Sequence, residues 1–217
     1  MSKTKPVLFN TDMVKKILTG EKTQTRRLIL PQPDGAHSVL DCDMEEKTFD
    51  LMCGNGGQGG AFLDWAETVK PKFWFDDILY VRETWRVQSG HRFDSEAKIE
   101  FRAGGPMSVI RFQNRDAYDR FIEKWGDGTE WNPSIFMPKE AARILLLIED
   151  VRPMRLREMS AAAVKAEGAE TLEAFAGIWD GIIAADKKET LGWAANPWVF
   201  AYVFKRISKE EATGLER

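Results

Sequence analysis

Apolar residues recur at spacings of three and four in several parts of the chain, which is the pattern of a helix with one buried face. Residues 13–18 show it first, with Asn10 or Thr11 as the predicted cap and Gly20 as the predicted end. The same signals predict further helices after Asn114, after Ser160 and after Thr171.

Other segments alternate between apolar and polar residues or are continuously apolar, which favours strands. The clearest covers residues 77–87, where Leu79, Val81, Glu83 and Trp85 share one face. Prolines and glycines interrupt residues 31–60, so we expect a long insertion there with one hairpin, and a surface loop at the glycine run 54–60. Further strands are predicted at 97–103, 107–112, 142–151 and 198–207.

The predicted strands do not alternate with crossover helices, which argues against a doubly wound parallel sheet. We therefore expect an α+β fold, with a mostly antiparallel β-barrel and helices at its mouth. No linker divides the chain, so residues 1–207 are predicted to form a single domain with insertions at about 31–72 and 88–130. Residues 208–217 are expected to be a polar, frayed tail.

The composition is that of an ordinary globular protein, with 30% charged residues and a net charge of -3. Such a charge does not favour a long nucleic-acid footprint, so any basic site must be local. The N-terminal residues lack the apolar core of a secretory signal, and the two cysteines lack a disulfide or metal-binding pattern. We expect a cytoplasmic protein that does not enter a membrane and uses neither a metal nor another cofactor.

One short segment combines several chemically active side chains. Lys22 is a candidate base, Thr23 and Thr25 carry hydroxyls, and Arg26 and Arg27 carry guanidiniums. This combination suits recognition of a phosphate or a nucleobase, and it also suits hydroxyl-based nucleophilic chemistry.

Motifs in four parts of the chain support a family resemblance. Residues 17–27 contain Gly-x-Lys-Thr-x-Thr-x-Arg, residues 77–85 read Asp-Ile-Leu-Tyr-Val-Arg-Glu-Thr-Trp, and segments 133–138 and 196–199 add two further matches. Together they resemble the ASCH domain family of the PUA-like superfamily, in particular its longer members, many of them phage-encoded. Asp76 stands where the family usually has glycine, and aspartate tolerates the left-handed turn expected there.

The resemblance implies a five- or six-stranded barrel, a cleft beside the first helix, and a role with RNA or a modified nucleoside. Small bacterial relatives are amidohydrolases that deacetylate N4-acetylcytidine with a lysine, a threonine and a glutamate. Their motif assigns the lysine and threonine roles to Lys22 and Thr25. Their glutamate lies seven residues after the hydroxyl residue that caps a helix, and counting seven residues from Ser160 gives Glu167.

The proposed chemistry sets two conditions. A lysine acts as a base only if its pKa falls from ~10.4 toward ~7–8, which burial and nearby arginines favour. A carboxylate at Glu167 would instead raise the pKa of Lys22. On a regular strand Thr25 and Lys22 also point to opposite faces, so they converge only if the chain turns between them.

Five further residues are predicted to bind the ligand or RNA: Thr23, Arg26, Arg27, Glu83 and Trp85. Arg27 shares a strand face with the predicted nucleophile, so it is favoured over Arg26 for a phosphate or base contact. Glu83 lies on an apolar face, so we predict an ion pair with Arg27 or another arginine. Trp85 is a candidate for base stacking as well as for the core.

Three functions follow from these observations. The first is recognition of RNA or a modified nucleoside in a small cleft, with amidohydrolase activity toward N4-acylated cytidine. The second is a non-catalytic RNA-binding module, in which the cations bind phosphate. The third is a ribonuclease, in which Lys22 and an arginine stabilise the transition state.

Overall fold

The computed structural model describes residues 4–53, 65–126 and 128–215. Contacts divide the chain into two compact units. The first unit comprises Met1–Gly20, Asp77–Leu147 and Arg206–Arg217, and the second comprises Glu21–Asp76 and Ile148–Lys205. The predicted surface loop at residues 54–60 lies outside the described residues.

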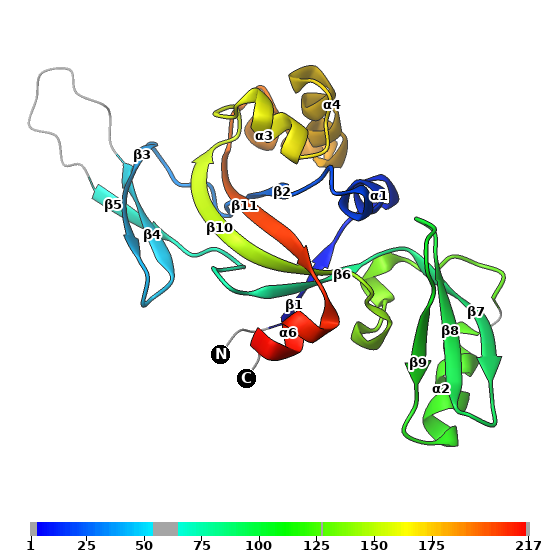
Figure 1. The fold of residues 1–217 in the computed structure, drawn as a ribbon. Coiled ribbons are helices and arrows are strands. Elements are labelled where there is room, and N and C mark those ends of the chain that lie inside the picture. The colour runs from blue at the N-terminus through cyan, green and yellow to red at the C-terminus, as the bar shows by residue number, and fades with distance from the viewer. Residues whose placement is uncertain (1–3, 54–64, 127, 216–217) are drawn as a thin grey trace, which may run out of the picture. The chain divides into compact units, whose positions relative to one another are not determined.

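The first unit holds part of the largest sheet, a smaller antiparallel sheet and several helices (Figure 1). Its strands are β1 (Thr4–Leu8), β6 (Ile78–Arg82), β7 (Trp85–His91), β8 (Glu96–Phe101), β9 (Ser108–Arg111) and the start of β10 (Leu145–Arg155). Its helices are α1 (Thr11–Thr19), α2 (Arg115–Trp125), α6 (Lys209–Leu215) and the 3-10 turns η1 (Ser134–Phe136) and η2 (Lys139–Ala141). β1 runs parallel to β6, whereas β10 runs antiparallel to it.

Capping residues set the ends of α1 and α2, as predicted. The Asn10 side chain accepts a hydrogen bond from Met13 N at 2.9 Å, and Gly20 ends α1 in the left-handed conformation, with φ of 81°. Asn114 accepts from Ala117 N at 2.9 Å in the same way. These side-chain bonds satisfy N–H groups that a helix start leaves without an internal partner.

The predicted strand at 77–87 is interrupted at residues 83–84, between β6 and β7. Glu83 is buried there, and Arg143 donates to both of its carboxylate oxygens, at 2.9 and 2.7 Å. The arginine that pairs with Glu83 is therefore Arg143 and not Arg27. Burial raises the pKa of the Glu83 carboxyl, and the hydrogen bonds and charge of Arg143 oppose this rise.

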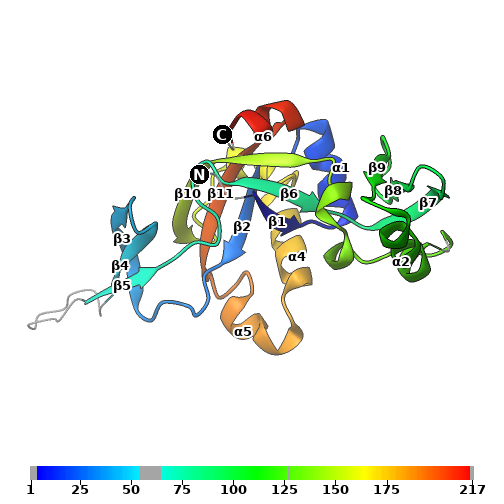
Figure 2. The same cartoon turned by 90° about the horizontal axis from the view of Figure 1, so that it is seen from below.

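Trp85 begins β7 and is fully buried. Its ring stacks on Phe121 at 6.0 Å and packs against Trp125 at 5.6 Å, which joins α2 to the β7–β8–β9 sheet. Figures 1 and 2 both show α2 beside these strands. Trp85 therefore belongs to the hydrophobic core of the first unit. Of the two roles predicted for it, base stacking and core packing, the structure shows the second.

The second unit contains the remainder of β10, most of β11 and a separate three-stranded sheet. Its other strands are β2 (Gln24–Leu28), β3 (Ala36–Asp43), β4 (Thr48–Cys53), β5 (Trp65–Val69) and β11 (Trp198–Ile207). Its helices are α3 (Ala161–Ala166), α4 (Leu172–Ile182), α5 (Lys188–Leu191) and the 3-10 turn η3 (Ala185–Lys187). β11 runs antiparallel to β2, and α3 and α4 pack on a core that includes Leu156, Val164 and Trp179.

The fold is mixed α+β with mostly antiparallel sheets, but the described residues form no closed barrel. The largest sheet has the strand order β1-β6-β10-β11-β2, so β1 and β2 are its two edges. The predicted barrel is therefore wrong in this respect, because closure would require these two edges to pair.

Several other elements also differ from the sequence prediction. β1 was not predicted, and the expected frayed tail contains α6. Ser208 Oγ accepts from Glu211 N at 3.1 Å, and Glu211 accepts from Ser208 N at 2.7 Å. This reciprocal capping, together with the burial of Ala212 against Ile78, stabilises a helix that its polar composition concealed.

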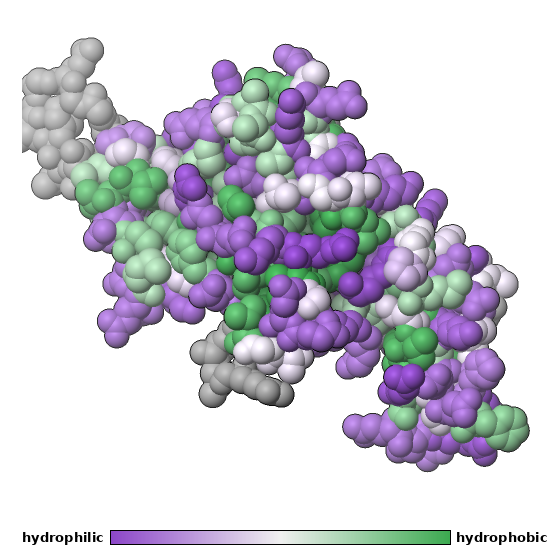
Figure 3. Space-filling model, in the orientation of Figure 1, coloured by the Kyte–Doolittle hydropathy of each residue, from purple (hydrophilic) through white to green (hydrophobic). Residues whose placement is uncertain are grey.

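Among the described residues, no helix has the length and apolar character needed to cross a membrane. Hydrophilic residues cover much of the face seen in Figure 3, with hydrophobic patches between them. The first predicted insertion, 31–72, contains the strands β3, β4 and β5. The second, 88–130, contains the strands β8 and β9 and the helix α2.

Replacing Arg143 with methionine should destabilise the protein by about 3–5 kcal/mol, because Glu83 would remain buried without its cation. Arg111→Met is the matched control. It removes an arginine whose side chain is 78% exposed from its pair with Glu96, and should cost about 0–1 kcal/mol. Urea unfolding measures both values. Equal losses in the two variants would contradict this interpretation of the Glu83–Arg143 pair.

Candidate functional site

The segment before β2 is fastened to the end of α3 within the second unit. Thr23 N donates to Ala166 O at 2.9 Å, and Phe204 N donates to Thr23 O at 2.9 Å. The first bond uses a carbonyl at the helix end that has no partner inside the helix. Lys22, immediately before this anchor, is thereby held at the C-terminal end of α3.

The end of α3 is defined by its own sequence. Ser160 caps the helix start by accepting from Ala163 N at 3.2 Å, and Gly168 ends the helix in the left-handed conformation, with φ of 81°. Glu167 lies at the C-cap position between them. A carboxylate is unfavourable at a helix C-terminus unless a cation lies nearby, because the carbonyl groups there carry partial negative charge.

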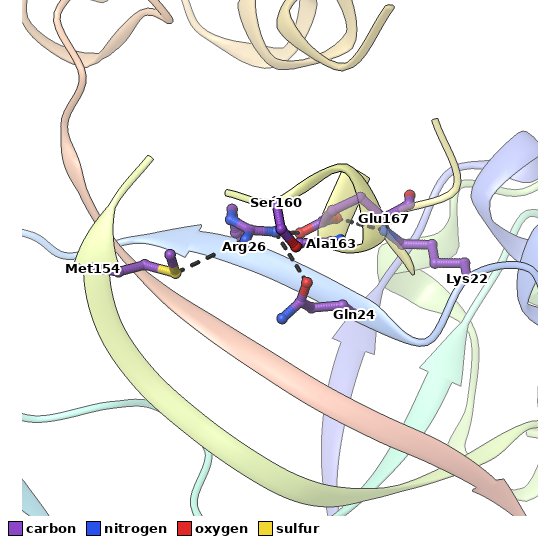
Figure 4. Close-up of polar contacts among 7 residues, drawn as sticks. All are labelled: Lys22, Gln24, Arg26, Met154, Ser160, Ala163 and Glu167. Carbon is purple, nitrogen blue, oxygen red and sulfur yellow. Dashed lines mark hydrogen bonds and ion pairs between the residues drawn. The ribbon is translucent and has the colours of Figure 1, made fainter. Parts of the chain in front are cut away.

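Two cations surround Glu167 (Figure 4). Lys22 Nζ lies 2.8 Å from Glu167 Oε2 and donates to the Glu167 backbone carbonyl, also at 2.8 Å. Arg26 Nη1 lies 2.9 Å from Glu167 Oε1. The exposed fractions of the three side chains are 0% for Lys22, 1% for Arg26 and 4% for Glu167. We call Lys22, Arg26 and Glu167 the Glu167 cluster.

Burial and charge act on Lys22 in opposite directions. Burial lowers the pKa of the Lys22 ammonium, and the charge and hydrogen bond of Glu167 oppose this fall. Arg27 and Arg26 lower the Lys22 pKa further, because each disfavours another cation nearby. Burial also lowers the pKa of Arg27, against the opposing charges of Glu167 and Tyr202. The net direction for Lys22 is the one that a general base requires.

Arg26 extends the cluster along β2 and toward β10. Its Nη1 also donates to Gln24 Oε1 at 3.2 Å, and its Nη2 contacts Met154 Sδ at 3.8 Å. Its buried Nε has no hydrogen-bond partner among the described residues. The bond between Gln24 and Arg26 shows that these side chains share one face of β2, as residues two apart in a strand do.

A cavity of about 410 Å³ lies on this face, within the second unit. β2 contributes Gln24 and Arg26, and α3 and the residues before it contribute Ser160 and Ala163. Its other lining residues are Asp150, Arg152, Pro153, Met154, Glu158, Met159, Ala201 and Val203. The volume falls within the range of about 300–1,000 Å³ that is typical of small-molecule sites.

The remaining candidates from the sequence lie outside the Glu167 cluster. Thr25 is buried in β2, and its Cα partner in β11 is Tyr202. Regular alternation places Thr25 on the face opposite to Gln24 and Arg26. Thr23 is exposed and Arg27 is half-buried. Glu83 and Trp85 belong to the first unit and make the contacts described above.

Arg26 was among the predicted binding residues, and the structure adds two residues that sequence reasoning missed, Gln24 and Met154. Arg26, rather than the favoured Arg27, forms the ion pair with Glu167. Gln24 was not singled out, although its spacing of two from Arg26 was a signal that they share a face. Met154 contacts Arg26 across 128 positions of sequence, and no local pattern predicts such a contact.

No group of histidine, cysteine, aspartate or glutamate within residues 4–53, 65–126 and 128–215 has an arrangement that could hold a metal ion. No protein-family model, curated protein or solved structure matches the chain. The candidate site therefore rests on its own geometry and on the motifs in the sequence.

Replacing Glu167 with glutamine should destabilise the protein by about 3–5 kcal/mol, because two buried cations would lose their shared anion. Glu149→Gln is the matched control in the same unit, since Glu149 pairs at the surface with Lys205 and its side chain is 43% exposed. That variant should lose about 0–1 kcal/mol. Urea unfolding at neutral pH compares them, and a Glu167→Gln loss no larger than the control would contradict the role of the cluster.

Proposed function

We propose that the protein binds a modified nucleoside in the second unit and hydrolyses the exocyclic amide of N4-acylated cytidine. One observation carries the proposal. The lysine and the glutamate that the family motif assigns to catalysis, 145 positions apart, are in direct contact and buried. Arg26 connects this pair to a cavity of nucleoside size.

The groups needed for amide hydrolysis are a base, a nucleophile and a group that stabilises the oxyanion. In the proposed reaction, neutral Lys22 takes the proton of the Thr25 hydroxyl as its oxygen attacks the acyl carbonyl carbon. The resulting oxyanion is stabilised by a guanidinium, for which Arg26 and Arg27 are the candidates. Lys22 then gives the proton to N4 as the carbon–nitrogen bond breaks, which releases cytidine and leaves an acyl ester on Thr25.

Water completes the cycle by attacking the ester, with Lys22 again as the base, and releases the carboxylic acid. Glu167 holds the Lys22 ammonium in position and orients the water or the exocyclic amine. The contact between Lys22 and Glu167 supports their two roles, whereas the role of Thr25 rests on the motif. Since alternation directs Thr25 to the other face of β2, the proposed reaction requires a local rearrangement of the chain at residues 22–25.

A second candidate function is recognition of RNA or a nucleoside without catalysis. It is favoured by a specific observation: Lys22 has no exposed side-chain surface, and neither Lys22 nor Glu167 lines the cavity. In this function the Glu167 cluster only positions Arg26, which contacts the ligand. Binding of RNA would then weaken steeply with salt, because phosphate contacts release counterions.

Incubation with N4-acetylcytidine, followed by chromatographic detection of cytidine, separates these functions. We expect turnover by the native protein, and a loss of at least about 100-fold in Lys22→Ala, Thr25→Ala and Glu167→Gln. Lys205→Ala, which removes an exposed lysine of the same unit, is the control and should retain activity.

A folded native protein that releases no cytidine would exclude this hydrolase. Salt-dependent RNA binding without turnover would then support the binding module, and shortening of the RNA would support a ribonuclease.

A further inference from the structure

We infer that Gln24 selects a cytosine-type base by donating an amide N–H to the adjacent ring acceptors N3 and O2. This inference rests on the proposed function and names the group that reads the base. It starts from the side chain of Gln24, which lines the cavity and is bonded to Arg26.

The orientation of the Gln24 amide follows from chemistry. A guanidinium has only N–H donors, so the Gln24 atom that faces Arg26 must be the acceptor Oε1. The Gln24 amide nitrogen Nε2 is therefore directed away from Arg26, as Figure 4 shows. It has no hydrogen-bond partner among the residues that the structure describes, so both of its N–H groups remain for a ligand.

Arg26 is itself fixed, which makes the Gln24 amide a preorganised donor. Glu167 holds one side of the guanidinium at 2.9 Å, and Met154 Sδ contacts it at 3.8 Å. Rotating the Gln24 amide by half a turn would place Nε2 against the guanidinium, donor against donor. The buried Glu167 cluster thus determines which polar atoms of Gln24 the cavity presents.

Three other polar side chains that line the cavity have a partner within the protein. Asp150 pairs with Arg152, Glu158 accepts from Arg155 N, and Ser160 accepts from Ala163 N. Gln24 adds to this lining an amide N–H donor that no protein group among the described residues accepts and whose direction its bond to Arg26 fixes.

A ligand that matches this donor must present an acceptor where its ring faces Gln24 Nε2. Cytosine presents N3 and O2 side by side, and acylation of N4 leaves both available. Uracil has a donor at N3, so the fixed N–H donor of Gln24 opposes it. Gln24 therefore reads the cytosine ring while leaving the N4 substituent for the chemistry.

The test compares binding of cytidine and uridine by calorimetry, with Gln24→Glu as the decisive variant. The native protein should prefer cytidine by about tenfold or more, the lower end of the discrimination that paired hydrogen bonds provide. Gln24→Glu offers only acceptors, so it should weaken cytidine binding at least tenfold and reverse the preference toward uridine. Gln24→Met should abolish the preference without reversing it.

Gln88→Glu introduces the same charge at an exposed position of β7 and should leave the preference unchanged. If the native protein binds or hydrolyses N4-acetylcytidine but Gln24→Glu keeps the native preference for cytidine, the inference about Gln24 is overturned and the proposed function stands. If the native protein binds no nucleoside and has no turnover, both are overturned.

Discussion

A single buried carboxylate, Glu167, lies between Lys22 and Arg26, and the arrangement of the site follows from it. Burying an ion is costly unless a partner and hydrogen bonds replace its water. Here both carboxylate oxygens have a cation, and the Lys22 ammonium also binds a backbone carbonyl. When Lys22 is protonated, the Glu167 cluster therefore holds two cations for one anion.

The same interaction connects separate parts of the chain. It joins the start of β2 to the end of α3, where the backbone bond from Thr23 to Ala166 adds a second fastening. Through Arg26 the connection reaches Gln24 and Met154, and so the lining of the cavity. Catalytic chemistry and recognition of the base are thus proposed to depend on one buried ion cluster.

The features that could be predicted from the sequence are those that depend on neighbouring residues, such as the helix caps. Asn10, Asn114, Ser160 and Thr171 each cap the helix expected of them, because capping depends on neighbouring residues. The position of Glu83 on an apolar face predicted an arginine partner. Which arginine it is could not be predicted, because Arg143 lies 60 positions away in the sequence and tertiary packing brings it to Glu83. Strand pairing at the sheet edges and the contact between Arg26 and Glu167 are equally non-local. For this reason the sequence predicted a barrel that the described strands do not close, and it favoured Arg27 over Arg26.

The most direct test of this account is an NMR titration of the Lys22 side chain in the native protein and in Glu167→Gln. Burial should place the Lys22 pKa below its ordinary value of 10.5, and removing the Glu167 carboxylate should lower it further, because that carboxylate favours the charged form. A lowered lysine pKa also means that its unfavourable contribution to folding diminishes as pH rises toward 10.5. An ordinary Lys22 pKa, unchanged in Glu167→Gln, would contradict a buried Glu167 cluster.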